Sequence, residues 1–152
     1  MKSLISLRLA AILAQILLAL LIIYHLYLLL TLLSGNEMIL EKIWGGNMNK
    51  LRGPIVLESL SIALLTIFLI LTNYCYRLLE SREMRRHRYI ARRFCRIFAA
   101  LFFINTLLNL LIGIGYERFF ALISLVLALL YLRMIKGKRV SKRAGRTADA
   151  TI

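Results

Sequence analysis

The chain has 152 residues, of which 61% are hydrophobic, and its mean hydropathy is +0.77. A water-soluble domain is about half apolar, so this composition argues against a soluble globular protein. The formal charge of +14 comes from basic residues gathered in a few short segments. No separate soluble domain or nucleic-acid-binding motif accompanies them, which excludes nucleic acid as the expected partner. Long uncharged runs between the charged segments predict an all-α integral membrane four-helix bundle.

The first predicted helix covers about residues 5–33. Its uncharged run, 9–36, is interrupted by His25 alone and is long enough to cross a hydrocarbon layer of about 30 Å. A secretory signal peptide has an apolar core of about 7–15 residues followed by a small-residue cleavage site. This run is longer and no such site follows it, so we interpret it as a transmembrane helix.

The first loop, residues 34–53, is expected to contain a short interfacial helix on the outer surface. Asn36 suits the N-cap position, and Gly45-Gly46 ends the segment. Trp44 lies on its apolar side, and tryptophan prefers the headgroup region of a membrane. The alternative is an ordinary polar loop.

The second and third predicted helices cover about residues 54–78 and 93–114. Pro54 is a favourable first-turn residue, and the third helix contains the uncharged run 97–113. A turn at Gly113 and Gly115 then leads into the fourth helix.

The fourth predicted helix covers about residues 117–135. Its uncharged part is short for a span unless Arg118 and Arg133 reach outward to the interfaces. The four helices form one predicted domain, 1–135, in up-down-up-down order, and a basic tail, 136–152, is expected to be disordered.

Lysine and arginine are distributed unevenly between the two sides of the predicted bundle. The N-terminus, the middle loop and the tail together carry 17 of them, and the opposite side carries 4. Basic residues concentrate on the cytoplasmic side of membrane proteins. We therefore predict a multi-pass protein of the plasma or inner membrane with both termini in the cytoplasm.

Several polar side chains interrupt the predicted spans. Polar groups inside a bilayer are costly, so each is a candidate for function. At about 1.5 Å of rise per residue, His25, Ser61 and Asn109 fall at similar depths in the outer half of the membrane. Glu58 lies about one turn above Ser61, and Asn105 is on the same stripe of its helix as Asn109. These five candidates for an intramembrane polar site are His25, Glu58, Ser61, Asn105 and Asn109.

Two interpretations of this polar layer remain open. It is a proton-linked or cation site, with Glu58 titrating, His25 as its partner and Asn109 as a neutral ligand. Alternatively, Glu58 reaches the outer interface as a hydrated charge, and His25 stays neutral, bonded to a carbonyl or to Tyr24 or Tyr27.

A second set of candidates lies in the middle segment, 77–96, which has eight arginines, two glutamates and no glycine or proline. Anionic headgroups of the inner leaflet attract such clusters by about 1 kcal/mol per basic residue. Docking of an acidic cytoplasmic protein is the alternative. The candidate lipid or partner contacts are Arg82, Arg85, Arg86, Arg88, Arg92 and Arg93.

No catalytic, cofactor-binding or metal-binding motif is present in the sequence. It has no Gly-rich phosphate loop, and His25 and His87 are predicted on opposite sides of the membrane. Cys75 and Cys95 are interpreted as free thiols. We therefore expect no enzyme, no cofactor and no metal.

The leading functional hypothesis from the sequence is an accessory or assembly subunit, or a regulator, of a larger membrane complex. It would act through its helix faces and the arginine segment on a partner membrane protein. The alternative is a small oligomeric transporter or channel with a polar site at Glu58, His25 and Asn109. Glu58→Gln should matter little for the first and strongly for the second.

Overall fold

The computed structural model describes residues 5–34, 52–80, 85–111 and 117–136. Within these ranges the chain is all-α, with four helices and no strand. The helices are α1 (Leu7–Leu33), α3 (Arg52–Glu80), α4 (Arg85–Leu111) and α5 (Glu117–Ile135). Each of the four is long and apolar enough to cross a membrane, which supports a multi-pass membrane protein. The expected interfacial helix and nearly all of the basic tail lie outside the described residues.

The ends of the first helix follow from local capping. The Ser6 hydroxyl accepts a hydrogen bond from the Leu9 amide at 3.1 Å, as an N-cap residue does. At the other end, the Ser34 amide donates to the Leu30 carbonyl at 3.0 Å. The 27 residues between these caps extend over about 40 Å, more than the hydrocarbon core requires.

The other helix bounds show one clear difference from the sequence prediction. The third predicted helix, about 93–114, is α4, Arg85–Leu111, which begins earlier than predicted, and residues 112–114 lie outside the described residues. No glycine or proline interrupts the residues before 93, so the helical hydrogen bonds continue through the arginines. α3 is slightly longer than the predicted 54–78, whereas α5 has the predicted bounds of 117–135.

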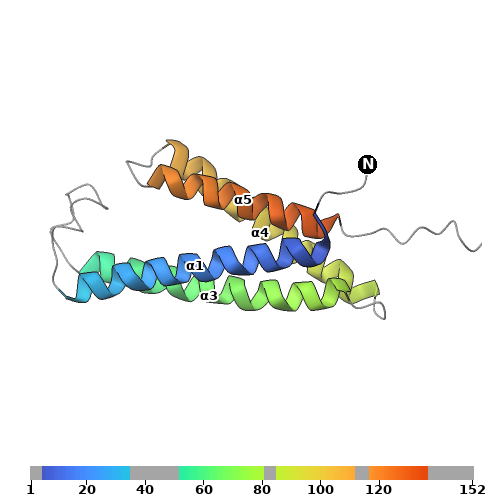
Figure 1. Ribbon diagram of the computed structural model, residues 1–152, viewed down its shortest axis with the longest axis horizontal. Helices are drawn as coiled ribbons and strands as arrows, with labels where there is room; N and C mark the ends of the chain where they lie inside the picture. The colour runs from blue at the N-terminus through green and yellow to red at the C-terminus, as the bar shows by residue number, and fades with distance from the viewer. Residues whose placement is uncertain (1–4, 35–51, 81–84, 112–116, 137–152) are drawn as a thin grey trace, which may run out of the picture.

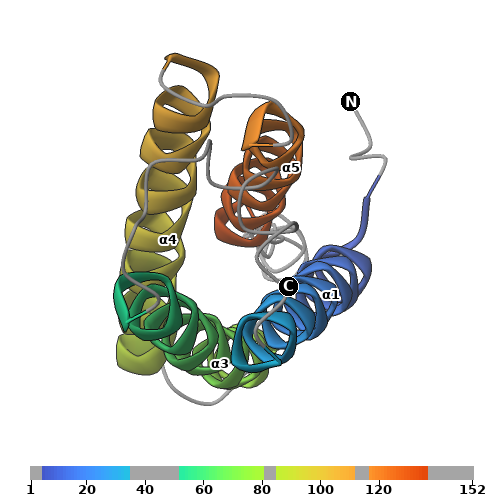
Figure 2. The ribbon, with the colours of Figure 1, turned by 90° about the vertical axis from the view of Figure 1, so that its left-hand side faces the viewer.

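The helices alternate in direction and form two antiparallel hairpins, α1 with α3 and α4 with α5 (Figure 1). Contacts between the hairpins run from α1 to α5 and from α3 to α4. An end-on view shows the four helices around a ring in the order α3, α1, α5, α4 (Figure 2). The hairpins lie close together where α1 begins and α5 ends, and they diverge toward the opposite end (Figure 1).

We call the first of these regions the closed end, and its contacts join both hairpins. Nε of Arg133 on α5 donates to the Ile5 carbonyl before α1 at 2.6 Å. Cys75 on α3 and Cys95 on α4 are free thiols with no exposed surface. The start of α1 and the end of α5 therefore lie on the same side of the bundle.

An aromatic layer lies next to the closed end. The Tyr131 hydroxyl lies 2.5 Å from the hydroxyl of Thr72, so a hydrogen bond links α5 to α3. The Tyr131 ring stacks on Phe102 at 5.8 Å and meets the edge of Phe98 at 5.3 Å. Small residues on α1, Ala10 and Ala14, are also completely buried, which allows close helix approach.

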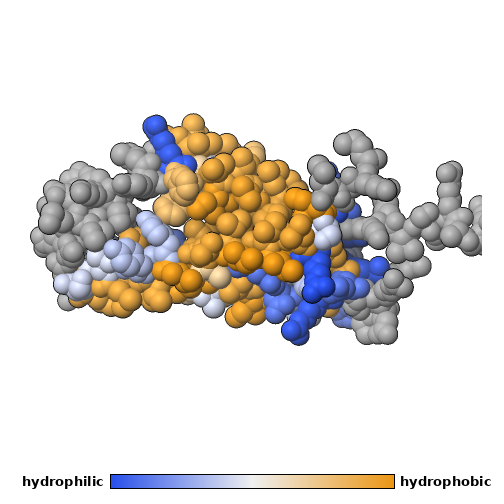
Figure 3. Space-filling model, viewed as in Figure 1, coloured by the Kyte–Doolittle hydropathy of each residue, from blue (hydrophilic) through white to orange (hydrophobic). Residues whose placement is uncertain are grey.

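The outer surface of the bundle matches a membrane environment. Figure 3 shows an apolar belt across the middle of the molecule, with hydrophilic residues concentrated toward its ends. Large apolar side chains are exposed on all four helices. In water such a surface would be an aggregation hazard, whereas in a bilayer it faces lipid chains.

Packing of the Tyr131 ring, more than its hydrogen bond, is expected to hold the hairpins together. Tyr131→Phe should cost about 0.6 kcal/mol, the typical value for an interhelical hydrogen bond in a membrane. Tyr131→Ala should cost about 3 kcal/mol or more, because it empties a fully buried site. Unfolding of the purified protein in detergent measures both, and Thr72→Val combined with Tyr131→Phe should add almost nothing to Tyr131→Phe alone. Equal losses for the Phe and Ala variants would refute this account.

Candidate functional site

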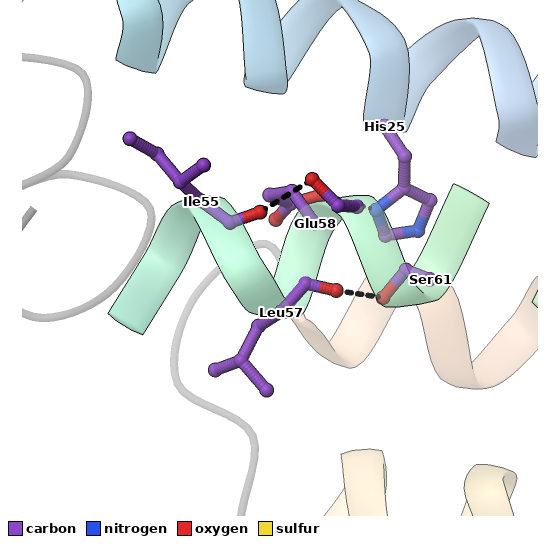
Figure 4. A network of polar contacts seen from close by, with 6 residues as sticks. His25, Ile55, Leu57, Glu58 and Ser61 are labelled. Carbon is purple, nitrogen blue, oxygen red and sulfur yellow. Dashed lines mark hydrogen bonds and ion pairs between the residues drawn. The ribbon is translucent and has the colours of Figure 1, made fainter. Parts of the chain in front are cut away.

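The polar residues in the half of the bundle away from the closed end are centred on an ion pair between α1 and α3. Nδ1 of His25 lies 2.6 Å from Oε2 of Glu58. Figure 4 shows the Glu58 carboxylate beside the imidazole ring, with Ser61 one turn further along α3. A carboxylate can only accept hydrogen bonds, so Nδ1 of His25 carries the proton whenever Glu58 is ionised.

The pair is well shielded from the surroundings. The Glu58 side chain is 3% exposed and that of His25 is 23% exposed. An isolated carboxylate moved from water into an apolar interior loses several kcal/mol of solvation, which a close, hydrogen-bonded partner offsets. The other acidic residues in the described ranges, Glu80 and Glu117, lie at helix ends.

The contacts of Glu58 and His25 agree with the first interpretation of the polar layer, in which the two side chains are partners. Glu58 is buried and is not a hydrated charge at the outer interface, because a helix neighbour covers it. His25 bonds to Glu58 rather than to a tyrosine, although the Tyr24 ring meets its edge at a centroid distance of 5.7 Å.

A cavity of about 570 Å³ opens beside the pair, between the two hairpins. All four helices line it, and four of the five sequence-predicted residues are on its wall. The fifth, Glu58, is not on the wall, but it bonds to His25, which is. The polar residues of the wall are His25, Ser61, Asn105, Asn109 and Ser124.

Hydrogen bonds fix two of these polar groups and determine what they offer to a ligand. The Ser61 hydroxyl donates to the Leu57 carbonyl at 2.9 Å, so its oxygen is left as an acceptor (Figure 4). Nδ2 of Asn105 donates to the Ser124 hydroxyl at 2.8 Å, which links α4 to α5. Asn109, expected as a neutral ligand of Glu58, lies half-buried on the α4 side of the same cavity.

The remainder of the wall is apolar and partly aromatic. Phe68, Phe102 and Phe120 contribute from three different helices, together with leucines of α1, α3 and α4. The pocket thus combines an apolar body with a few converging polar groups, as small-molecule sites do.

The arginine segment is mostly helical surface and not a loop. Arg86, Arg88, Arg92 and Arg93 belong to the first turns of α4, and Arg86 and Arg93 are exposed. Arg82 and the side chain of Arg85 lie outside the described residues. These basic groups are on the α4 turns nearest the closed end, far along the helix from the cavity residues.

Sequence reasoning missed some of the polar contacts. Ser124 was not among the predicted site residues, but it lines the cavity and accepts a hydrogen bond from Asn105. Thr72 and Tyr131 were not singled out, although they form a buried hydroxyl pair. The sequence shows each of them only as a hydroxyl side chain within an uncharged run. Such side chains are common in membrane helices, and their presence does not identify a bonding partner.

Comparison with protein-family models, curated proteins and solved structures finds no match for this chain. The described residues contain no group of three or more His, Cys, Asp or Glu side chains arranged to hold a metal ion.

We predict that the His25–Glu58 pair can be removed without unfolding the protein, provided that both partners are replaced together. His25→Leu should cost about 3 kcal/mol or more, because it leaves a buried carboxylate without its partner. The double variant His25→Leu/Glu58→Leu should come within about 1 kcal/mol of the native protein, as hydrophobic replacements of buried pairs often do. Detergent unfolding of both variants measures this, and additive losses would mean that the pair is retained for stability.

Proposed function

We propose that this protein is a small, non-enzymatic carrier of the plasma or inner membrane that exchanges a cation for a proton at the His25–Glu58 pair. The observation that carries the proposal is the convergence of the polar residues of all four helices on one cavity beside a buried ion pair. Buried ionisable groups within membrane spans commonly mark ion or proton pathways.

The orientation in this proposal has both termini in the cytoplasm. Its support is the distribution of basic residues, 17 against 4 in the sequence. The hydrogen bond from Arg133 to Ile5 is consistent with this arrangement, because it brings the start of α1 and the end of α5 to one side. The cavity then opens toward the external side, and the closed end faces the cytoplasm.

The exchange step follows from charge balance. With Glu58 ionised and His25 protonated, the pair is neutral. When an external cation binds to the Glu58 carboxylate, it takes the place of the imidazolium charge, and His25 releases its proton to water in the cavity. The pair with its bound cation is again neutral, so neither state leaves an uncompensated charge in the apolar interior.

Within the described part of the chain, few other ionisable groups surround the pair. Tyr24 on α1 is one of them, and its ring meets the edge of the His25 ring. The parts of the cavity wall that come from α4 and α5 are neutral, with Asn105, Asn109 and Ser124 as the polar members. The proton released on cation binding is therefore assigned to His25.

To release the cation into the cytoplasm, the two hairpins have to separate at the closed end. The contacts between hairpins there are the Thr72–Tyr131 hydrogen bond, the aromatic layer and the Arg133–Ile5 hydrogen bond. A rocking of the α1/α3 hairpin against α4/α5 would open that end and close the cavity. Assembly into a homo-oligomer would provide a fixed partner for this motion.

The transport test uses purified protein in liposomes with a trapped pH indicator. External Na⁺, K⁺, tetramethylammonium or tetraphenylphosphonium is added at equal ionic strength, and proton movement is recorded. At least one of these cations should drive proton movement, and Glu58→Gln should reduce it by more than tenfold. Glu80→Gln is the matched control, because it removes an exposed carboxylate from the other end of the same helix and should leave the flux unchanged.

A second candidate is the accessory or assembly subunit that acts through the arginine segment. The specific observation in its favour is that exposed Arg86 and Arg93 are presented on a helix, a defined surface for anionic lipid or an acidic partner. Two results together would favour the subunit proposal over the carrier proposal. No cation would drive proton movement, and Arg86→Gln/Arg93→Gln would abolish co-purification of a stoichiometric partner.

A further inference from the structure

We propose that the carried solute is an organic monocation with an apolar body, such as a quaternary ammonium or phosphonium compound. This inference rests on the proposed cation exchange and names its substrate class. It is drawn from the charge of the cavity, the chemistry of its wall and a second, neighbouring groove.

The polar groups of the cavity favour a positively charged guest. Among the described residues, the acidic group beside it is Glu58, whose charge His25 compensates only while His25 is protonated. Ser61 has used its proton on the Leu57 carbonyl, and Asn105 has used a donor on Ser124. The Ser61 oxygen and Oδ1 of Asn105 remain as acceptors, and the second Nδ2 proton of Asn105 remains as a donor. Selectivity for a cation therefore comes from the Glu58 charge next to His25, which attracts a cation and repels an anion once His25 has given up its proton.

The rest of the wall suits an apolar body. Phe68, Phe102 and Phe120 surround the polar groups, and aromatic faces attract a cation within about 6 Å of the ring centre. A volume of about 570 Å³ is within the usual range of about 300–1,000 Å³ for small-molecule sites. The cavity thus matches a compound of many atoms rather than a single ion.

A bare inorganic ion is poorly served by the same wall. Hard cations such as Ca²⁺ and Mg²⁺ take about six or more oxygen ligands at about 2.0–2.6 Å. The polar oxygens here are few and spread over four helices around a wide space, and the described residues hold no metal-binding cluster. A large organic cation needs no such shell, because its charge is already dispersed.

A smaller apolar groove supports entry of the apolar body from the lipid side. It measures about 240 Å³, lies between α1 and α5, and includes Tyr24 and Phe119. Leu21 and Phe120 line both this groove and the main cavity, so the two are neighbours with a shared wall. The rings of Tyr24 and Phe120 lie 4.9 Å apart at that position. A membrane-partitioned cation would pass along this groove with its charged centre directed toward Glu58.

The test compares two probes of nearly equal shape and opposite charge, tetraphenylphosphonium and tetraphenylborate. Equilibrium binding is measured with the full chain in lipid nanodiscs, and partitioning into empty nanodiscs is subtracted. The native protein should bind the phosphonium saturably and at least tenfold more tightly than the borate. Glu58→Gln should weaken phosphonium binding at least tenfold, while Glu80→Gln should not change it.

The comparison of the two probes on the native chain needs no variant, so it remains decisive if Glu58→Gln fails to fold. Equal retention of both probes would overturn the inference and indicate that the cavity holds lipid chains without charge selection. Absence of saturable phosphonium binding would overturn it as well.

Failure of the carrier proposal gives a different pattern of results. If binding is selective for the phosphonium but no protons move in liposomes, the proposed ligand class stands and the transport proposal is rejected. If Na⁺ or K⁺ alone drives proton movement, the transport proposal stands and the organic cation is rejected.

Discussion

The charge of Glu58 is the constraint on which the candidate site depends. A carboxylate in an apolar span has to be neutralised or paired, since its desolvation costs several kcal/mol. The chain pairs it with His25 on the neighbouring helix α1 at 2.6 Å. Hydrophobic residues of similar size would stabilise this interface without the cost of burying charges. Retaining an ionisable pair beside a cavity is therefore better explained by function than by folding.

The two ends of the bundle differ in how the hairpins meet. At the closed end, aromatic rings, small residues and the Thr72–Tyr131 hydrogen bond join the two hairpins. Toward the other end the hairpins diverge, and the cavity lies between them. Polar side chains from all four helices line it. A firm contact at one end and an opening at the other is the geometry from which a rocking motion can expose the site alternately. The carrier proposal uses both features.

The sequence was sufficient for the helices but only partly sufficient for the site. Long apolar runs fix membrane helices because the bilayer sets their length, so four spans could be predicted. The start of α4 was misplaced, because charge was taken as a boundary although the helix continues through the arginines to Arg85. Depth along each helix left a contact between His25 and Glu58 as one of two open interpretations, and the structure has the two side chains 2.6 Å apart. Which faces meet depends on helix rotation, and sequence periodicity is silent about this when a helix such as α1 is apolar on all sides. The Asn105–Ser124 bond and the Thr72–Tyr131 pair were hidden for the same reason.

The most direct measurement of the central claim is the accessibility of the cavity to water from one side of the membrane. In a Cys75→Ala/Cys95→Ala background, a single cysteine is placed at Ser61 in the cavity, at buried Ala14 or at exposed, lipid-facing Ala63. A membrane-impermeant, positively charged methanethiosulfonate reagent is then added from either side. The account predicts rapid labelling of the Ser61 position from the external side only, and no labelling at Ala14 or Ala63. An unreactive cysteine at Ser61, or one labelled first from the cytoplasmic side, would contradict it.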